Sequence, residues 1–227
     1  MKISKDLEIL GLGLKYKDNL ILTDLHIGIE EALNKQGLLI PRFQFKEIKE
    51  ALEKLLSKIK FSKIIINGDL KHEFGTISKQ EWRNTLKILE LLEKYAKIIL
   101  IKGNHDKILE PIAEKKNIEI VDYYKVDDVL IAHGDKIIKQ KASTIIIGHE
   151  HPTISFKERP NEKFKCYLKG KYKDSTLIVQ PSFSLVTQGS DIMQEKLLSP
   201  YLKDVSDFEI FVVEDKIYNF GKIKNIQ

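Results

Sequence analysis

The sequence is short of several features that would place it in an exported, membrane-bound or cofactor-binding class. It has one cysteine, Cys166, among 227 residues, so no disulfide can form within the chain. No apolar run approaches the roughly 20 residues that cross a bilayer, and no charged leader precedes an apolar stretch. We therefore expect no membrane contact and a cytoplasmic location.

Linkers, repeats and several catalytic motifs are also missing. No Pro/Gly/Ser-rich stretch or low-complexity tract divides the chain, which predicts a single domain over residues 1–227. The chain has no nucleophile elbow, no phosphate-binding GxxxxGK loop and no motif for a nicotinamide or flavin cofactor. Enzymes that depend on these devices are therefore disfavoured.

Arginine is scarce in an otherwise basic chain. Only Arg42, Arg83 and Arg159 are arginines among the 38 basic residues, while the net charge is +5 and the pI is near 9.0. A basic domain attracts polyanions such as nucleic acid. A simpler explanation is compositional, because an A+T-rich coding sequence or a heat-adapted proteome gives the same bias. Charge alone therefore leaves nucleic-acid binding open.

Short apolar runs bounded by turn residues predict a series of buried strands. They lie at residues 7–10, 20–23, 63–67, 97–101, 129–133 and 144–148. Helical periodicity separates the early runs at residues 43–60 and 78–95, and Ser78 with Glu81 three residues later forms a capping signal for the second helix. This alternation predicts crossover units and a largely parallel sheet.

Strand-like runs without helices dominate the chain after about residue 150. They lie at residues 154–158, 164–170, 175–181, 208–215 and 216–222. The pattern predicts a second, more antiparallel sheet. The expected fold class is α/β, with two mixed β-sheets packed face to face and flanked by helices.

Polar residues gather where the predicted strands end. The set includes five of the six histidines and consists of Asp24, His26, Asp69, Asn104, His105, Asp106, His133, His149 and His151. Because the carboxyl ends of neighbouring strands line a common crevice, we expect these side chains to converge. Any one of them could be a core histidine, a helix cap or a turn residue, but independent turns give no reason for the joint placement.

Seven of these groups suit a pair of transition-metal ions. They are two carboxylates, one amide and four imidazoles, which is too many for one tetrahedral zinc. Mixed oxygen and nitrogen donors favour manganese, with iron, zinc or nickel as alternatives, over calcium and magnesium. Two divalent ions also exceed the charge of two carboxylates, so the centre would attract an anion such as a phosphate ester.

Five motifs, in chain order, resemble those of the calcineurin-like metallophosphoesterases. They are DLH at 24–26, GD at 68–69, GNHD at 103–106, HG at 133–134 and GHEH at 148–151. The resemblance implies a four-layer sandwich of two sheets flanked by helices. It also implies one ion on Asp24, His26, Asp69 and His151, and another on Asp69, Asn104, His133 and His149.

The same resemblance assigns roles around the two ions. His105 corresponds to the catalytic histidine that assists the leaving oxygen, and Asp106 is expected to orient its ring. His149 and His151 are expected to point to the same side of an extended segment, so that each reaches a different ion.

A narrower resemblance concerns GDLKHEFG at 68–75, GLLIPRFQ at 37–44 and PSFSLVTQGSDI at 181–192. These stretches are similar to the small phosphoesterases related to the bacterial DNA-ligase-associated phosphoesterase, and more distantly to the nuclease subunit of the double-strand-break repair complex. The likeness implies a role in substrate processing for His72, with a simple loop role as the alternative. The chain shows no DNA-capping domain, so double-strand-break processing is not carried over.

We therefore expect a metal-dependent phosphodiesterase or nuclease that uses a two-metal-activated hydroxide, with His105 assisting the leaving group. The alternatives are a phosphomonoesterase or nucleotide phosphatase of the same fold and, less favoured, a non-catalytic metal-binding scaffold. Residues 163–173 interleave lysines with aromatic residues, which suits either a nucleic-acid surface or an edge strand. The oligomeric state is open, with a homodimer as one option.

Overall fold

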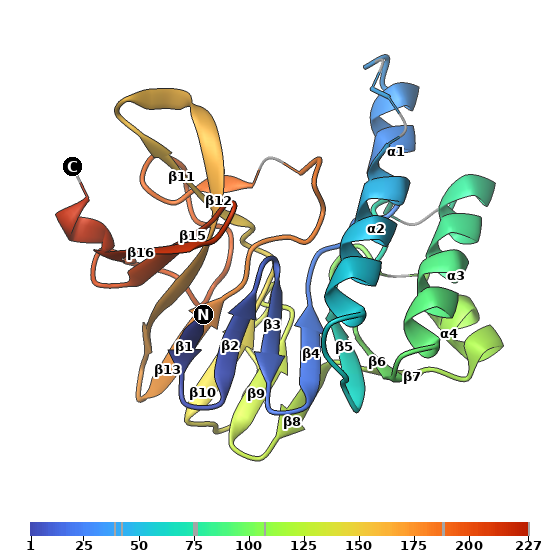
Figure 1. Cartoon of the computed structure of the whole chain (residues 1–227), viewed down its shortest axis with the longest axis horizontal. Coiled ribbons are helices and arrows are strands. Elements are labelled where there is room, and N and C mark those ends of the chain that lie inside the picture. The colour runs from blue at the N-terminus through green and yellow to red at the C-terminus, as the bar shows by residue number, and fades with distance from the viewer. Residues whose placement is uncertain (39, 42, 75–76, 107, 188, 227) are drawn as a thin grey trace.

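The computed structural model describes residues 1–38, 40–41, 43–74, 77–106, 108–187 and 189–226. Two β-sheets pack against each other, and the α-helices lie on the outer side of the first sheet (Figure 1). The predicted fold class is confirmed. The expectation of a single domain stays a prediction.

The first sheet is mixed and is built in chain order. Its strands are β1 (Lys2–Ser4), β2 (Leu7–Leu10), β3 (Gly13–Tyr16), β4 (Asn19–Leu22), β5 (Lys63–Asn67), β6 (Lys97–Ile101) and β7 (Glu119–Val121). Strands β1 to β4 form an antiparallel meander, whereas β4 to β7 are parallel. The parallel half is the crossover arrangement that the strand and helix alternation predicts.

In the described part of the chain the helices beside this sheet are α1 (Ile29–Lys35), α2 (Gln44–Leu56), α3 (Lys79–Glu93) and α4 (Glu110–Lys116). Helices α2 and α3 fall within the predicted ranges, and the Ser78 hydroxyl caps α3 by accepting a hydrogen bond from the Glu81 N–H at 3.0 Å. Helices α1 and α4 were not predicted. Each has only seven residues, too few for a clear helical period.

The second sheet begins earlier than expected. Its strands are β8 (Tyr123–Val126), β9 (Val129–Ala132), β10 (Thr144–Ile147), β11 (Pro152–Phe156), β12 (Arg159–Tyr172), β13 (Ser175–Val179), β14 (Ser190–Asp191), β15 (Glu209–Val213) and β16 (Ile217–Lys222). The predicted boundary near residue 150 is therefore wrong. Strand β10 is parallel to both β9 and β13. Strands β9 and β10 resemble the parallel strands of the first sheet in burial and composition, so their sequences do not separate the two sheets.

Both faces of the central strands are buried, which explains their unbroken apolar runs. In β4, Leu20 and Leu22 pack under the helices, while Ile21 faces the second sheet. In β10, Ile145 and Ile147 face away from the first sheet and Ile146 faces it. A strand buried on both sides shows no polar alternation.

The outer face of the second sheet is covered by chain that follows β14 rather than by α-helices. Tyr201, Leu202 and Val205 pack there with Ile223, the first residue of the short 3₁₀ helix η1 (Ile223–Asn225). None of the helices described is both long and apolar enough to cross a bilayer.

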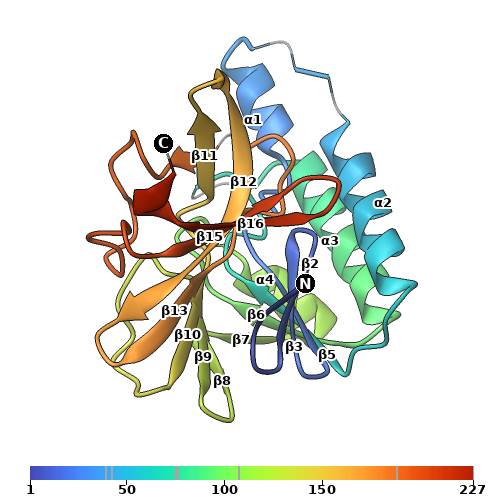
Figure 2. The same cartoon turned by 60° about the vertical axis from the view of Figure 1, so that its left-hand side comes forward.

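Strand β12, which carries the basic and aromatic stretch 163–173, lies inside the second sheet (Figure 2). It pairs with β11, β13 and β15, so the expectation of an edge strand is wrong. Tyr167 is fully buried between the two sheets, and Tyr172 packs against Tyr201 with ring centroids 4.8 Å apart. Tyr167 is therefore not available to stack on a nucleic-acid base.

Candidate metal centre

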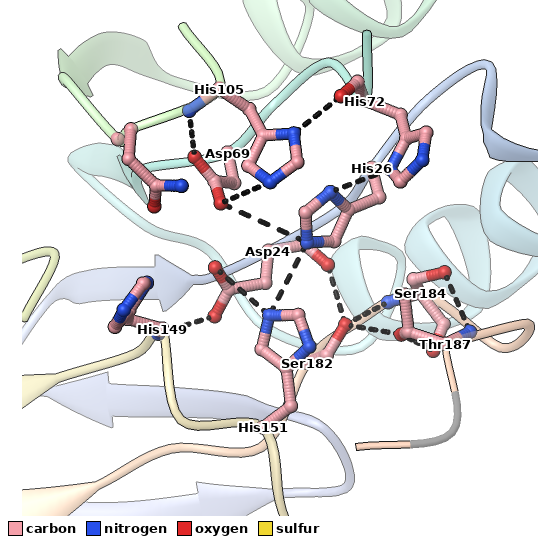
Figure 3. A network of polar contacts seen from close by, with 12 residues as sticks. Asp24, His26, Asp69, His72, His105, His149, His151, Ser182, Ser184 and Thr187 are labelled. Carbon is pink, nitrogen blue, oxygen red and sulfur yellow. Dashed lines mark hydrogen bonds and ion pairs between the residues drawn. The ribbon is translucent and has the colours of Figure 1, made fainter. Parts of the chain in front are cut away.

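Backbone strain marks the ends of the strands that carry the predicted ligands. Five of these residues have a positive φ, namely Asp24 (53°), His26 (47°), Asp69 (48°), His149 (64°) and His151 (48°). Non-glycine residues in this region cost on the order of 1 to 3 kcal/mol each and gather at functional sites. The strain turns five side chains from three loops into one crevice (Figure 3).

The extended geometry expected for His149 and His151 is wrong. Both residues are left-handed, and the chain bends between them because the Glu150 N–H bonds the Gly148 carbonyl at 2.7 Å. The two rings still reach different partners, since His151 joins Asp24 and His149 joins Asp69 and His133.

Glycines stand where another backbone or a carboxylate passes too close for a side chain. A Cβ at Gly103 would overlap the carboxylate and the backbone nitrogen of Asp69, and a Cβ at Gly148 would overlap the Thr23 hydroxyl. A Cβ at Gly68 would overlap the His133 ring. These close approaches explain the first glycine of the GD, GNHD and GHEH motifs.

Asp24, His26 and His151 form the first candidate ligand group. The Asp24 Oδ1 atom lies 3.3 Å from His151 Nε2, and the Nε2 atoms of His26 and His151 are 3.3 Å apart (Figure 3). Asp24 Oδ2 accepts hydrogen bonds from the Thr23 hydroxyl at 2.7 Å and from the His149 N–H at 3.0 Å. Oδ1 is buried without a hydrogen-bond donor, so it is the oxygen left for a cation.

Asp69, His133 and His149 form the second candidate group, and Asn104 lies beside it. Asp69 Oδ2 is 3.4 Å from His133 Nε2, and Asn104 Oδ1 is 3.0 Å from the same nitrogen. The rings of His133 and His149 meet edge to face, with centroids 5.0 Å apart. In each group the candidate ligand atoms all lie within 4.8 Å of one another.

The His105 ring lies on the far side of Asp69. Its Nε2 is 3.8 Å from Asp69 Oδ2, its backbone N–H donates to Asp69 Oδ1 at 2.9 Å, and its Nδ1 makes a short contact with the His72 carbonyl oxygen. The half-exposed Phe74 ring packs against the imidazole, with centroids 3.7 Å apart. The carbonyl and Phe74 together hold the ring, so that Nε2 faces the crevice.

The structure also brings His72 to the crevice. Its Nδ1 lies 3.3 Å from the Nδ1 of His26, and a third group of neighbouring imidazoles joins these two rings with His105. His72 therefore lies beside His26 and His105 at the crevice.

Asp106 does not have the expected role. Its buried carboxylate accepts hydrogen bonds from the Gly103 N–H at 3.0 Å and the Lys71 N–H at 3.5 Å, and the His105 ring is oriented by the His72 carbonyl instead. Neighbouring residues of a turn project in different directions. Asp106 therefore does not contact the His105 ring, although the two residues are adjacent in the sequence. Asp106 orders the loop backbone.

Two supporting residues escaped the sequence analysis. Lys71 is fully buried, and its ammonium group donates to the backbone carbonyls of Glu73 and His105, the latter at 2.6 Å. Glu81, expected as a cap partner of Ser78, accepts hydrogen bonds from the backbone N–H groups of His72 at 2.8 Å and Glu73 at 2.9 Å. Lys71 lies within the GDLKHEFG stretch, which was the available signal for it, whereas Glu81 showed only the spacing of a cap partner.

The segment after β13 supports Asp24 from below (Figure 3). The Ser182 hydroxyl and the Ser184 N–H donate to the Asp24 carbonyl at 2.7 and 3.1 Å. Gln44 links this segment to the next ligand, because its Nε2 donates to Ser184 Oγ at 2.8 Å and to the His26 carbonyl at 3.3 Å. Gln44 and Ser184, which belong to the stretches 37–44 and 181–192 singled out in the sequence, thus meet behind the site.

Electrostatics favour a cation among these groups. Burial, followed by the charge of His151, lowers the pKa of His26 to about 3, and burial followed by the charge of His105 lowers the pKa of His72 to about 4. Burial opposes protonation of His133 too, but its hydrogen bond to Asp69 and the charge of Asp24 raise its pKa to about 10. His26 can therefore offer a neutral lone pair, as ligation requires, while the two carboxylates attract positive charge.

The donor set fits divalent transition metals. Carboxylate, amide and imidazole groups face one another, and one carboxylate oxygen lacks a donor. The glycines let the side chains of Asp69 and His133 approach closely. Mixed oxygen and nitrogen donors of this kind suit manganese, iron or zinc.

Comparison with known proteins agrees with this geometry. The family model for calcineurin-like phosphoesterases matches residues 20–205. The solved structure of nuclease MPE from Pseudomonas putida is 18% identical over 94% of each chain with a TM-score of 0.67, which supports a shared fold.

Two further solved structures are less similar. The phosphoesterase Yfce from E. coli is 12% identical over 92% of this chain and 94% of its own, with a TM-score of 0.45. Protein AQ665 from Aquifex aeolicus, of unknown function, is 23% identical over 59% of this chain and 78% of its own, with a TM-score of 0.40. No curated protein matches the chain. Since the family model spans most of the sequence, the chain belongs to the calcineurin-like phosphoesterases and is a metal-dependent phosphoester hydrolase.

Proposed function

We propose that the chain is a phosphodiesterase, acting on nucleic-acid strands or related diesters, that holds two divalent ions with manganese as the favoured metal. The observation that carries the proposal is the position of Asp69 Oδ2. This oxygen lies 3.4 Å from His133 Nε2, 3.8 Å from His105 Nε2 and 3.9 Å from His26 Nε2. One carboxylate thus faces both ligand groups and the candidate acid, as a bridging ligand must.

The ligand assignment follows the two groups around that bridge. Asp24, His26, Asp69 and His151 would hold one ion, and Asp69, Asn104, His133 and His149 would hold the other. When bound, the ions supply Lewis-acid polarisation of the phosphoryl group and an acidified water nucleophile. A mixed donor set favours manganese, with iron, zinc or nickel as alternatives.

His105 is proposed as the general acid for the leaving group. With Nδ1 held by the His72 carbonyl, the protonated ring carries its second proton on Nε2, the nitrogen that faces Asp69 and the crevice. From there it can donate to the departing oxygen of the ester. Positioned acids of this kind accelerate a reaction by about 10² to 10⁴-fold.

His72 is proposed to contact the substrate. Its ring lies within 3.3 Å of His26, and together with Phe74 and Lys35 it lines a hollow beside the crevice. Because a nuclease shares this fold, nucleic-acid strands are the first natural substrates to assay. A cytoplasmic location and a homodimer stay predictions.

The first experiment compares hydrolysis of a bis-substituted phenyl phosphodiester with that of the matching monoester in manganese. The proposal expects turnover of the diester. Hydrolysis of the monoester alone would move the assignment to a phosphomonoesterase or nucleotide phosphatase. Single-stranded DNA and RNA, tested next, separate a nuclease from an enzyme for small diesters.

Two variants separate an enzyme from a metal-binding scaffold. His105→Ala should keep both ions, measured by elemental analysis, and lose turnover, because its ring is outside the two ligand sets. Asp69→Asn should lose metal as well as turnover. Unchanged activity in both variants would contradict the proposal.

A further inference from the structure

A hollow of about 320 Å³ lies beside the metal centre, between strand β12 and the segment after β13. Its lining consists of Asn161, Lys163, Lys165, Leu185, Val186 and Thr187. Thr187 Oγ1 is 2.9 Å from Ser182 Oγ, which in turn donates to the Asp24 carbonyl at 2.7 Å. The hollow is therefore separated from the Asp24 backbone by a short chain of hydrogen bonds.

Lys165 gives this hollow a positive charge that forms no ion pair within the described ranges. Its ammonium group donates to the Ser182 carbonyl at 2.7 Å and makes a short contact with the Ser184 carbonyl, and within the described ranges it forms no ion pair with a carboxylate. Lys163 and Lys169 on the same strand differ, because they pair with Glu195 and Glu209. Two carbonyls fix the position of the Lys165 ammonium and leave its third N–H to a further acceptor.

Burial makes the unpaired charge of Lys165 more costly. It lowers the pKa of Lys165 to about 8, while the charge of Asp24 acts in the opposite direction. At neutral pH the group is therefore still mostly charged. A charge with restricted access to water is costly unless it is paired. The geometry of the hollow and the charge of Lys165 together favour the binding of an anion.

We propose that this hollow binds a second phosphate group of a nucleic-acid strand, next to the phosphodiester held at the metal centre, with Lys165 as the principal contact. The proposal rests on the proposed function and narrows its substrate to diesters that carry a neighbouring phosphate. The Asn161 amide supplies a neutral donor at the rim, and the half-exposed Leu185 side chain offers an apolar surface to a sugar or base.

A purely structural role for Lys165 predicts a different outcome. Lys165 also braces Ser182 and Ser184, which hold the Asp24 carbonyl. If bracing were its whole role, removing it would reduce metal content and kcat for every substrate alike. A phosphate contact instead raises KM only for substrates with a second phosphate.

The test compares Lys165→Gln with wild type on two substrates in manganese, a bis-substituted phenyl phosphodiester and a single-stranded oligonucleotide. We expect KM for the oligonucleotide to rise about tenfold more than KM for the aryl diester, as for the loss of one charge-assisted contact, because an effect of the lost bracing acts on both substrates and cancels in the ratio. The slope of log KM against log salt should fall by about 0.7, the value for one phosphate contact on a single strand. Lys171→Gln removes an exposed lysine of the same strand outside the hollow and should leave both values unchanged.

A second variant covers the case in which Lys165→Gln does not fold. Asn161→Asp places a negative charge at the exposed rim without touching Ser182 or Ser184, and should raise KM for the oligonucleotide alone. Equal losses on both substrates, or an unchanged oligonucleotide KM in the two variants, would overturn the phosphate subsite while leaving the phosphodiesterase intact. Failure of wild type to hydrolyse either diester would instead refute the proposed function and the subsite with it.

Discussion

Glu81 tests whether the loop that carries His72 is held by a charge or by an acceptor oxygen. The side chain is 1% exposed, and its Oε1 accepts hydrogen bonds from the backbone N–H groups of His72 and Glu73 at 2.8 and 2.9 Å. Burial raises the pKa of Glu81, and the two N–H groups only partly offset this effect. Ionisation is therefore harder in the folded protein than in the unfolded chain, so the charge is a cost.

The Ala and Gln variants should consequently differ. Glu81→Ala leaves two N–H groups without an acceptor, at roughly 1 to 3 kcal/mol each. Because His72 and Glu73 are only half-buried, we expect the low end, about 2 kcal/mol in total. Glu81→Gln keeps an acceptor oxygen in place and avoids the burial of charge, so its free energy of unfolding at pH 7 should stay close to wild type.

The pH dependence has a definite sign. With the folded pKa above the unfolded value of about 4.5, the folded protein binds more protons in the window just above that value. The contribution of Glu81 to stability is complete below this window and declines as pH rises through the raised pKa. Glu81→Gln should lack that decline. The difference in unfolding free energy between wild type and Glu81→Gln at each pH therefore gives the contribution of Glu81 alone, without that of the other acidic residues.

Urea denaturation at several pH values measures these free energies, and thermal melts should place the Tm of Glu81→Ala about 4 to 8 °C below wild type. A lower kcat with unchanged metal content is also expected, since the His72 carbonyl orients His105. Glu93→Gln, at the last residue of the same helix, is the control, because Glu93 makes only a surface pair with Lys116 at 3.4 Å. An Ala variant as stable and active as wild type would refute the reasoning.

Three further outcomes are expected. Gly103→Ala should lose bound metal and turnover, because its Cβ would overlap Asp69, whereas Gly13→Ala meets only flexible leucine side chains at 3.2 Å or more; elemental analysis of both decides this. Tyr167→Phe should raise the unfolding free energy by about 1 kcal/mol, since the buried hydroxyl has no hydrogen-bond partner among the residues that the structure describes; an unfolding midpoint lower than wild type would contradict it. Chelation should lower the Tm by about 10 to 20 °C relative to protein in metal at 100 times its Kd, because each of the two proposed ions then contributes about 2.7 kcal/mol, and a Tm insensitive to chelator would argue against a metal site.

Local features of the chain were sufficient to predict the main elements and the candidate ligands. Apolar runs identify β4, β5, β6, β9 and β10 whatever their neighbours, because a strand buried on both faces must be apolar throughout. The ligands could be found for a related reason. Each follows a strand directly, and a shared crevice at strand ends is a general property of such sheets.

Contacts between distant segments could not be predicted in this way. The apolar runs of β9 and β10 are compatible with either sheet, and only hydrogen bonding to β8 and β13 places them in the second. Glu81 has the right spacing for a cap, yet its carboxylate bonds the loop at His72, and Lys165 lies in a basic stretch but turns toward Ser182. Periodicity and motif spacing report on neighbours along the chain, whereas the partner of a buried charge is chosen by the folded packing around it.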